Sequence, residues 1–108
     1  MNFYTYFKYI VMIVADVTFY PIGKGISVGD TIEKVVKHME ENKSVKCYPN
    51  SMATVIECEN IEILFDTVKD AEKFLENLGF PRIETILRID NRIDLENSVD
   101  RKIKHFKE

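Results

Sequence analysis

The sequence predicts a single α+β domain in which strands and helices follow one another in the order β-α-β-β-α-β, with a further segment at each end. Three observations predict this fold class. Stretches of alternating apolar residues are separated by two stretches whose apolar residues have helical spacing. Glycine, proline or asparagine marks most of the boundaries between these stretches. The length of 108 residues is that of one domain with a single hydrophobic core.

The first strand is expected over residues 12–20, where every second side chain is apolar. Its apolar face consists of Ile13, Ala15, Val17 and Phe19. The other face is mixed, because it carries Asp16 and Thr18 beside Val14. We therefore expect the apolar face to lie on the core.

Residues 1–11 form an aromatic-rich extension before the domain proper, which spans residues 12–108. The extension does not resemble a signal peptide, because only Lys8 is basic and no small-residue cleavage site follows. Its composition is typical of a strand. We expect it to lengthen the first strand or to cover a sheet edge.

A glycine-rich loop, PIGKGISVGD, leads from this strand into the first helix. Ser27 and Asp30 have the spacing of a capping box, with Asp in place of the usual Glu. The apolar face of the helix consists of Val28, Ile32, Val35, Val36 and Met39. The helix is expected to end near Asn42.

A hairpin and a second helix are expected next. Short strands over residues 45–48 and 52–58 flank the turn Pro49-Asn50-Ser51. The apolar seam of the second helix consists of Ile61, Leu64, Val68, Ala71, Leu75 and Leu78. Gly79 is the predicted stop signal of this helix.

The last strand is expected over residues 83–90, with Ile83, Leu87 and Ile89 on its core face. A terminal helix is expected after it, because Val99, Ile103 and Phe106 have helical spacing. The complete order is that of the ferredoxin-like sandwich, in which two helices cover one face of an antiparallel sheet.

The second face of such a sheet is left open, and here it is mixed in character. Alternation places eight residues on it: Asp16, Thr18, Lys46, Tyr48, Glu57, Glu84, Ile86 and Arg88. Val14 and Val55 lie among them. A solvated face is common in antiparallel sheets. We nevertheless favour a face buried in a homodimer or homotetramer, because oligomers hide the edges and faces of small sheets.

Composition excludes several classes of function. The net charge of −3 argues against general nucleic-acid binding, and no apolar run reaches the ~18 residues of a membrane span. Cys47 and Cys58 lack the spacing of a zinc site and are too few for a disulfide scaffold. We expect reduced thiols, a cytoplasmic location and no metal or cofactor. No nucleophilic or catalytic triad is evident, and we expect no catalytic residues.

Two groups of residues remain candidates for binding. Backbone N–H groups of Gly23, Lys24 and Gly25 are able to hold an anion, although a plain connecting loop is the simpler interpretation. Asp16 and Glu57 lie on adjacent strands of the predicted sheet. They indicate either a site for a cationic or amino-bearing ligand or a salt-bridge network in an interface.

Taken together, three stretches of the chain resemble one known family. They are MIVADVTFYPIGKGISV, SMATVIEC and ETILRIDNRID. The family is the small YkoF-like thiamine-binding family of bacterial, archaeal and fungal proteins, and the resemblance runs from Met12 to about Phe106. It implies a ferredoxin-like fold, assembly as dimers and tetramers, and binding of thiamine or its hydroxymethylpyrimidine part. Asp16 replaces the family's usual Glu and Ala53 its Gly, whereas Asp90 and Arg92 match its last motif.

Thiamine combines an aminopyrimidine with a cationic thiazolium, so its site needs a carboxylate or carbonyl acceptor and apolar or aromatic faces. The residues expected to supply them are Asp16, Thr18, Tyr20, Tyr48, Met52, Thr54 and Glu57. Met52 and Thr54 alternate onto the face opposite Glu57. These residues line one pocket only if it lies at a strand end or between subunits.

Two other classes of function stay open beside a non-catalytic binding protein. One is a small dimeric α+β enzyme that uses the sheet face as its cavity, although no histidine lies in a predicted strand. The other is an amino-acid-sensing regulatory module that binds its ligand between helices of two subunits. An RNA-binding domain of similar topology is disfavoured, because residues 52–58 lack aromatic side chains for stacking.

Overall fold

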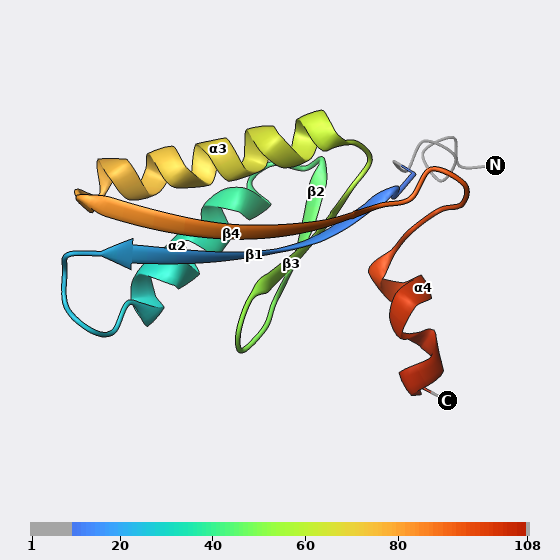
Figure 1. Cartoon of the computed structure of the whole chain (residues 1–108), viewed down its shortest axis with the longest axis horizontal. Helices are drawn as coiled ribbons and strands as arrows, with labels where there is room; N and C mark the ends of the chain where they lie inside the picture. Colours follow the sequence, from blue (N-terminus) through green and yellow to red (C-terminus); the bar gives the residue numbers. More distant parts are fainter. Residues whose placement is uncertain (1–9, 108) are drawn as a thin grey trace.

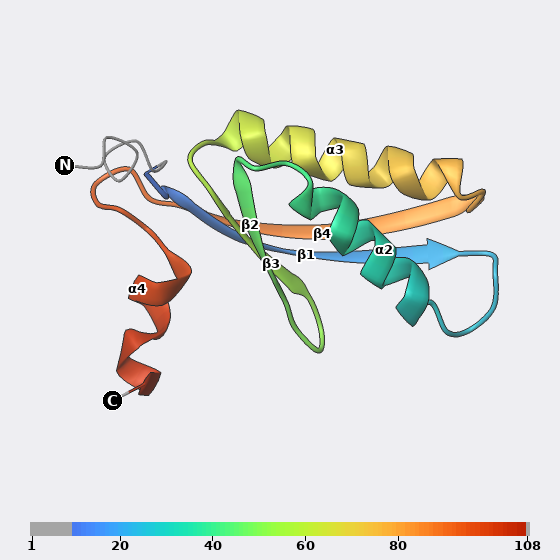
Figure 2. The same ribbon diagram turned by 180° about the vertical axis from the view of Figure 1, so that it is seen from behind.

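A computed structural model describes residues 10–107 of the chain and confirms the predicted fold class. Its elements are β1 (Ile13–Ile22), α2 (Gly29–Glu40), β2 (Val45–Pro49), β3 (Thr54–Cys58), α3 (Ile61–Asn77), β4 (Arg82–Asn91), α4 (Val99–Ile103) and the 3-10 helix η1 (Lys104–Lys107). The strand order is β2-β3-β1-β4, and every neighbouring pair is antiparallel. Helices α2 and α3 cover one face of this sheet (Figures 1 and 2).

The start of the chain is described only in part. Residues 1–9 of the predicted extension lie outside the described residues. Ile10, Val11 and Met12 precede β1, which begins one residue later than predicted and continues through Pro21 to Ile22. None of the helices within residues 10–107 has the length and apolar character that crossing a bilayer requires.

The core lies between the sheet and the two covering helices, as the periodicity predicts. Ile13 and Ile56 from the sheet and Leu64 and Leu75 from α3 have no exposed surface. Val35, Val36 and Met39 add the buried face of α2. Burial of such side chains is the main favourable contribution to folding, roughly 1.5–3 kcal/mol for each fully buried one.

The ends of the helices agree with the sequence signals in α3 but not in α2. Asn60 caps α3 by accepting a hydrogen bond from the Ile63 N–H at 2.9 Å, and Gly79 ends it with a φ of +91°. The predicted Ser27 cap of α2 is wrong. The helix begins one residue later, so Val28 occupies the capping position and no side chain caps the helix.

The loop between β1 and α2 needs its first glycine for close packing. Gly23 has a φ of +113°, and an added Cβ would lie 2.6 Å from the Pro81 ring. A side chain at this position would therefore strain the backbone and collide with the segment that enters β4.

The register of the strands confirms the predicted open face. Asp16 of β1 lies between Val55 of β3 and Arg88 of β4. The neighbouring row places Val14 between Glu57 and Asp90. On the open face, Val14 thus lies between two carboxylates, and Val55 lies between Asp16 and Tyr48, as the alternation indicates.

The C-terminal segment leaves the body of the domain after β4 and returns beside the open face. Helix α4 and η1 stand apart from the two-layer sandwich (Figures 1 and 2). The predicted terminal helix is confirmed, but its apolar residues are not buried within the described chain. Ile103 is 36% exposed and Phe106 is 87% exposed.

The buried thiols give a prediction about reactivity. Burial raises the pKa of both Cys47 and Cys58 to about 11, so very little thiolate is present in the folded protein at pH 8. We expect a disulfide reagent such as DTNB to label the folded chain at least about a hundredfold more slowly than the chain in guanidinium. Rapid labelling of both folded-state thiols would contradict their placement in the core.

The two buried thiols also make the free energy of unfolding depend on pH, and it should fall as the pH rises. Their folded-state pKa lies above the ordinary thiol value of 9.0, so the unfolded chain loses these protons first as the pH rises. The free energy of unfolding should therefore fall between about pH 9 and pH 11. Denaturant titrations of the wild type and of Cys58→Ala across this interval measure the contribution of that thiol.

Candidate functional site

A buried carboxylate connects the open sheet face to the C-terminal segment. Glu57 of β3 is only 7% exposed, although it lies on the face away from the covering helices. The Tyr48 hydroxyl donates a hydrogen bond to its Oε1 at 3.2 Å, and the backbone N–H of Val99 donates one to its Oε2 at 2.9 Å. Val99 is the first residue of α4, so Glu57 satisfies a backbone donor that the helix itself leaves free.

A buried asparagine holds the same segment from its other side. Asn97 is 2% exposed, and its side-chain amide donates to the backbone carbonyl oxygens of Asp90 at 3.1 Å and Met12 at 3.4 Å. Its own backbone N–H donates to the Val11 carbonyl at 2.6 Å. Asn97 and Glu57 therefore fix the path of the chain between β4 and α4.

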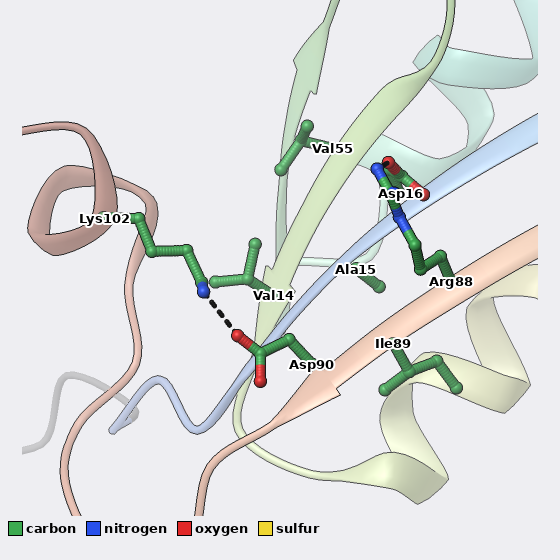
Figure 3. Close-up of a pocket in the computed structure, with 8 residues that line it drawn as sticks. All are labelled: Val14, Ala15, Asp16, Val55, Arg88, Ile89, Asp90 and Lys102. Atoms are coloured by element: carbon green, nitrogen blue, oxygen red, sulfur yellow. Dashed lines mark hydrogen bonds and ion pairs between the residues drawn. The ribbon is translucent and has the colours of Figure 1, made fainter. Parts of the chain in front are cut away.

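A cleft of about 380 Å³ opens where this segment faces the sheet (Figure 3). Its volume lies within the ~300–1,000 Å³ of small-molecule sites. The residues that line it are Val14, Ala15, Asp16, Val55, Arg88, Ile89, Asp90 and Lys102. Val14 and Val55 provide apolar side chains on the open face, and the charged groups lie to either side of them.

The charges of the cleft form two ion pairs. Arg88 donates to Asp16 Oδ2 at 2.5 Å, and Lys102 of α4 donates to Asp90 Oδ2 (Figure 3). The Asp16 side chain is 25% exposed, whereas the Arg88 side chain is 82% exposed and is free to move into solvent. Asp16 is thus the fixed partner, and an incoming cation or amino group can compete with Arg88 for it.

One carboxyl of the cleft, Asp90, is held in its charged form. The hydrogen bond from Lys102 holds the pKa of Asp90 below its ordinary value, so this carboxyl is ionised at neutral pH. An ionised carboxylate accepts hydrogen bonds but donates none. Within residues 10–107, no group of three or more His, Cys, Asp and Glu side chains is placed to hold a metal ion.

The predicted binding residues do not gather in one place. Asp16 lies in the cleft, whereas both oxygens of Glu57 and the hydroxyl of Tyr48 are engaged in the anchor of α4. Tyr20 is 45% exposed in the part of β1 that lies beyond the residues paired with β3.

The other three predicted residues lie together elsewhere. Thr18, Met52 and Thr54 line a smaller hollow of about 150 Å³ at the turn between β2 and β3. The Thr18 hydroxyl donates to the Met52 carbonyl at 3.2 Å there. Residues from the two faces of the sheet thus meet at this strand end, and the binding role of these three residues stays a prediction.

The glycine loop has a structural contact of its own. Lys24 donates to the Leu78 carbonyl at 2.5 Å, and its Nζ lies 5.1 Å from the centre of the Phe80 ring. The Lys24 side chain is therefore engaged at the C-terminal end of α3. The anion site at Gly23, Lys24 and Gly25 stays a prediction.

Sequence reasoning did not select Arg88, Asp90 or Lys102 as binding residues. The alternation of side chains already placed Arg88 on the open face. Asp90 follows Arg88 by two positions in the same strand, so the same rule places it on that face. No sequence pattern predicted that Lys102 lies at the cleft. Its position depends on hydrogen bonds that Glu57 and Asn97 make with residues elsewhere in the chain.

The amino-acid-sensing alternative places its ligand between helices of two subunits. Within the chain itself, a hollow of about 210 Å³ lies between the covering helices α2 and α3. Its polar lining consists of His38, Glu41, Asn42, Thr67 and Asp70. The His38 ring stacks on Phe74 with 4.6 Å between the ring centres, and its Nδ1 lies 3.4 Å from a Glu41 oxygen. These contacts give His38 a structural role in joining α2 to α3.

Comparisons with known proteins agree on one family. The family described as thiamine-binding protein matches residues 15–107. A UPF0045 protein of Methanocaldococcus jannaschii is 36% identical over 92 residues, which cover 85% of this chain and 89% of that protein. A crystal structure of a hypothetical protein from the same organism superimposes with a TM-score of 0.79 at 32% identity, covering 88% of this chain and 95% of the other.

A more distant structure shares the fold. It is described as a candidate thiamine biosynthesis or salvage protein of Thermotoga maritima, and it has a TM-score of 0.64 at 20% identity over 87% of this chain and 97% of its own. The match over residues 15–107 includes all of the sheet-and-helix sandwich except the first two residues of β1, and it includes the anchored C-terminal segment. The chain belongs to the thiamine-binding protein family.

Proposed function

We propose that the protein binds thiamine or a related pyrimidine in the cleft between the open sheet face and α4, and that it does so without catalysing a reaction. The observation that carries the proposal is the cleft's arrangement of apolar side chains between ionised groups. The family description and the description of the Thermotoga maritima neighbour support this class of ligand.

The chemistry of the cleft matches the two rings of such a ligand. Val14 and Val55 offer an apolar surface against which a flat ring packs. Asp16 offers a carboxylate to an exocyclic amino group or to the cationic thiazolium. Arg88 is exposed enough to leave its ion pair when the ligand arrives.

The sequence suggests that Glu57 contacts the ligand, but in this proposal Glu57 holds the C-terminal segment in place. Both of its carboxylate oxygens already accept hydrogen bonds from the chain. It supports binding by holding α4, which brings Lys102 to the rim of the cleft. Asp16 is therefore the residue whose substitution tests ligand contact directly.

Isothermal titration calorimetry with thiamine and hydroxymethylpyrimidine tests the proposed binding. We expect saturable binding in the micromolar range, and at least about tenfold weaker binding by Asp16→Asn, because a hydrogen bond to a charged group contributes roughly 1.5–3 kcal/mol. Glu84→Gln is the matched control, since Glu84 lies on the same open face but does not line the cleft. Flat titrations on folded protein, or equal losses in both variants, would contradict the proposal.

We also propose that the protein acts as a homo-oligomer that buries part of the open face. Ile86 in the middle of β4 is 60% exposed, and Tyr20 on the same face is 45% exposed. The projecting C-terminal segment adds Phe106, which is 87% exposed. Large apolar side chains gathered on one side of a small domain are typical of interfaces between copies.

Light scattering after size-exclusion chromatography tests this assembly. We expect a mass of two or four times the chain's 12.6 kDa at micromolar concentration. Ile86→Asp should shift the protein toward monomer, because a charge would be buried in the interface. Phe65→Asp is the control, since Phe65 is 53% exposed on α3 on the opposite side of the sheet. A wild-type monomer would overturn the proposed assembly.

A further inference from the structure

A further hollow, of about 450 Å³, shares Lys102 with the cleft and is lined mainly by cationic side chains. The residues that line it are Arg92, Asn97, Arg101, Lys102, Lys104 and His105. All six come from the segment that follows β4. Residues 92–108 carry five Lys and Arg and four Asp and Glu, a net charge of +1, within a chain whose net charge is −3.

Two of these cations are available to a ligand. Arg92 is paired with Asp94, and Lys102 is paired with Asp90. Arg101 and Lys104 make no ion pair with any carboxylate among residues 10–107. A hollow that holds two unpaired cations attracts an anion, and an arginine guanidinium matches the oxygens of a phosphate.

The helical spacing of the basic residues explains why they meet. Lys104 and His105 follow Arg101 by three and four positions, so the three side chains lie on one side of the turn. Ile103 and Phe106 are also three positions apart and fall on a different side. The segment thus separates a cationic side from an apolar side.

One residue joins the two hollows. Lys102 lines both the cleft and the cationic hollow, and its ammonium group is bound to Asp90 within the cleft. The two hollows are therefore neighbours that share the Lys102 side chain, with Val14 and Val55 on one side of it and Arg101 and Lys104 on the other. The ligand best suited to both hollows has a ring at one end and a phosphate at the other.

We propose that the cationic hollow is a phosphate subsite and that the protein prefers the phosphate esters of its ring-bearing ligand to the free alcohol. This inference rests on the proposed function for the identity of the ring. The subsite itself rests on the arrangement of Arg101, Lys104 and Lys102. It requires no bond to form or break.

Calorimetric titrations of the full chain test the subsite, with thiamine, thiamine monophosphate, thiamine diphosphate and inorganic pyrophosphate as probes. In the absence of divalent cations we expect thiamine diphosphate to bind at least about tenfold more tightly than thiamine. The preference should shrink as the salt concentration rises, because the added contacts are exposed charges. Equal affinities for thiamine and its diphosphate in the wild type would overturn the proposal.

A double variant and its matched control test whether the preference for the diphosphate comes from the cationic hollow. Arg101→Gln with Lys104→Gln should abolish the preference for the diphosphate and leave the affinity for thiamine unchanged. Lys34→Gln with Lys73→Gln removes the same total charge from exposed positions on α2 and α3 and should keep the preference. A preference that survives in the first double variant would place the phosphate elsewhere and overturn the proposal.

Pyrophosphate alone separates this inference from the proposed function. Saturable binding that the Arg101→Gln and Lys104→Gln variant loses supports the subsite even if thiamine gives no heat. If thiamine binds but neither pyrophosphate nor the diphosphate shows an added affinity, the proposed function survives and the subsite is wrong.

Discussion

The carboxylate of Glu57 lies between the open face of the sheet and the first turn of α4, where each of its oxygens accepts a hydrogen bond. Removing a carboxylate from water costs free energy unless donors replace the lost hydration. Here the replacements are a tyrosine hydroxyl from β2 and a backbone N–H from α4. The folded position of the C-terminal segment therefore depends on this side chain together with Asn97.

The cleft and the cationic hollow both follow from that attachment. Without the anchored segment, the open face would be a sheet surface with the ion pair of Asp16 and Arg88. The segment brings Lys102 to Asp90 and so adds a wall to the cleft. It also gathers Arg101 and Lys104 on the far side of that wall. The sheet contributes apolar surface and negative charge, and the segment contributes positive charge.

The sandwich itself was predictable from the sequence because its signals are local. Alternation in β1 and β4 and helical spacing in α2 and α3 each predict one core face. The structure buries the central residues of those faces in β1, α2 and α3 and partly buries the core face of β4. The capping position of α2 was not predictable in the same way. Ser27 has the right chemistry, but the backbone enters the helix one residue later.

The candidate site was predictable only where it depends on strand alternation. Asp16 and Arg88 were assigned to the open face correctly, and Asp90 follows from the same rule. Glu57 was also assigned to this face, yet its hydrogen bond to Val99 joins residues 42 positions apart. No periodicity within either segment reports such a contact. The wall formed by Lys102 and the adjacent cationic hollow therefore appear only in three dimensions.

Hydrogen exchange of the Val99 backbone amide, followed by NMR in the wild type, Glu57→Gln and Glu57→Ala, tests whether Glu57 holds α4 against the sheet. We expect slow exchange in the wild type and in Glu57→Gln, because glutamine keeps an oxygen that accepts from Val99. In Glu57→Ala, exchange should accelerate at least about tenfold at Val99 while the Ile56 amide in the core stays protected. If Val99 of the wild type exchanged at the rate of an unfolded peptide, α4 would not be held by Glu57, and the proposed origin of the cleft would be wrong.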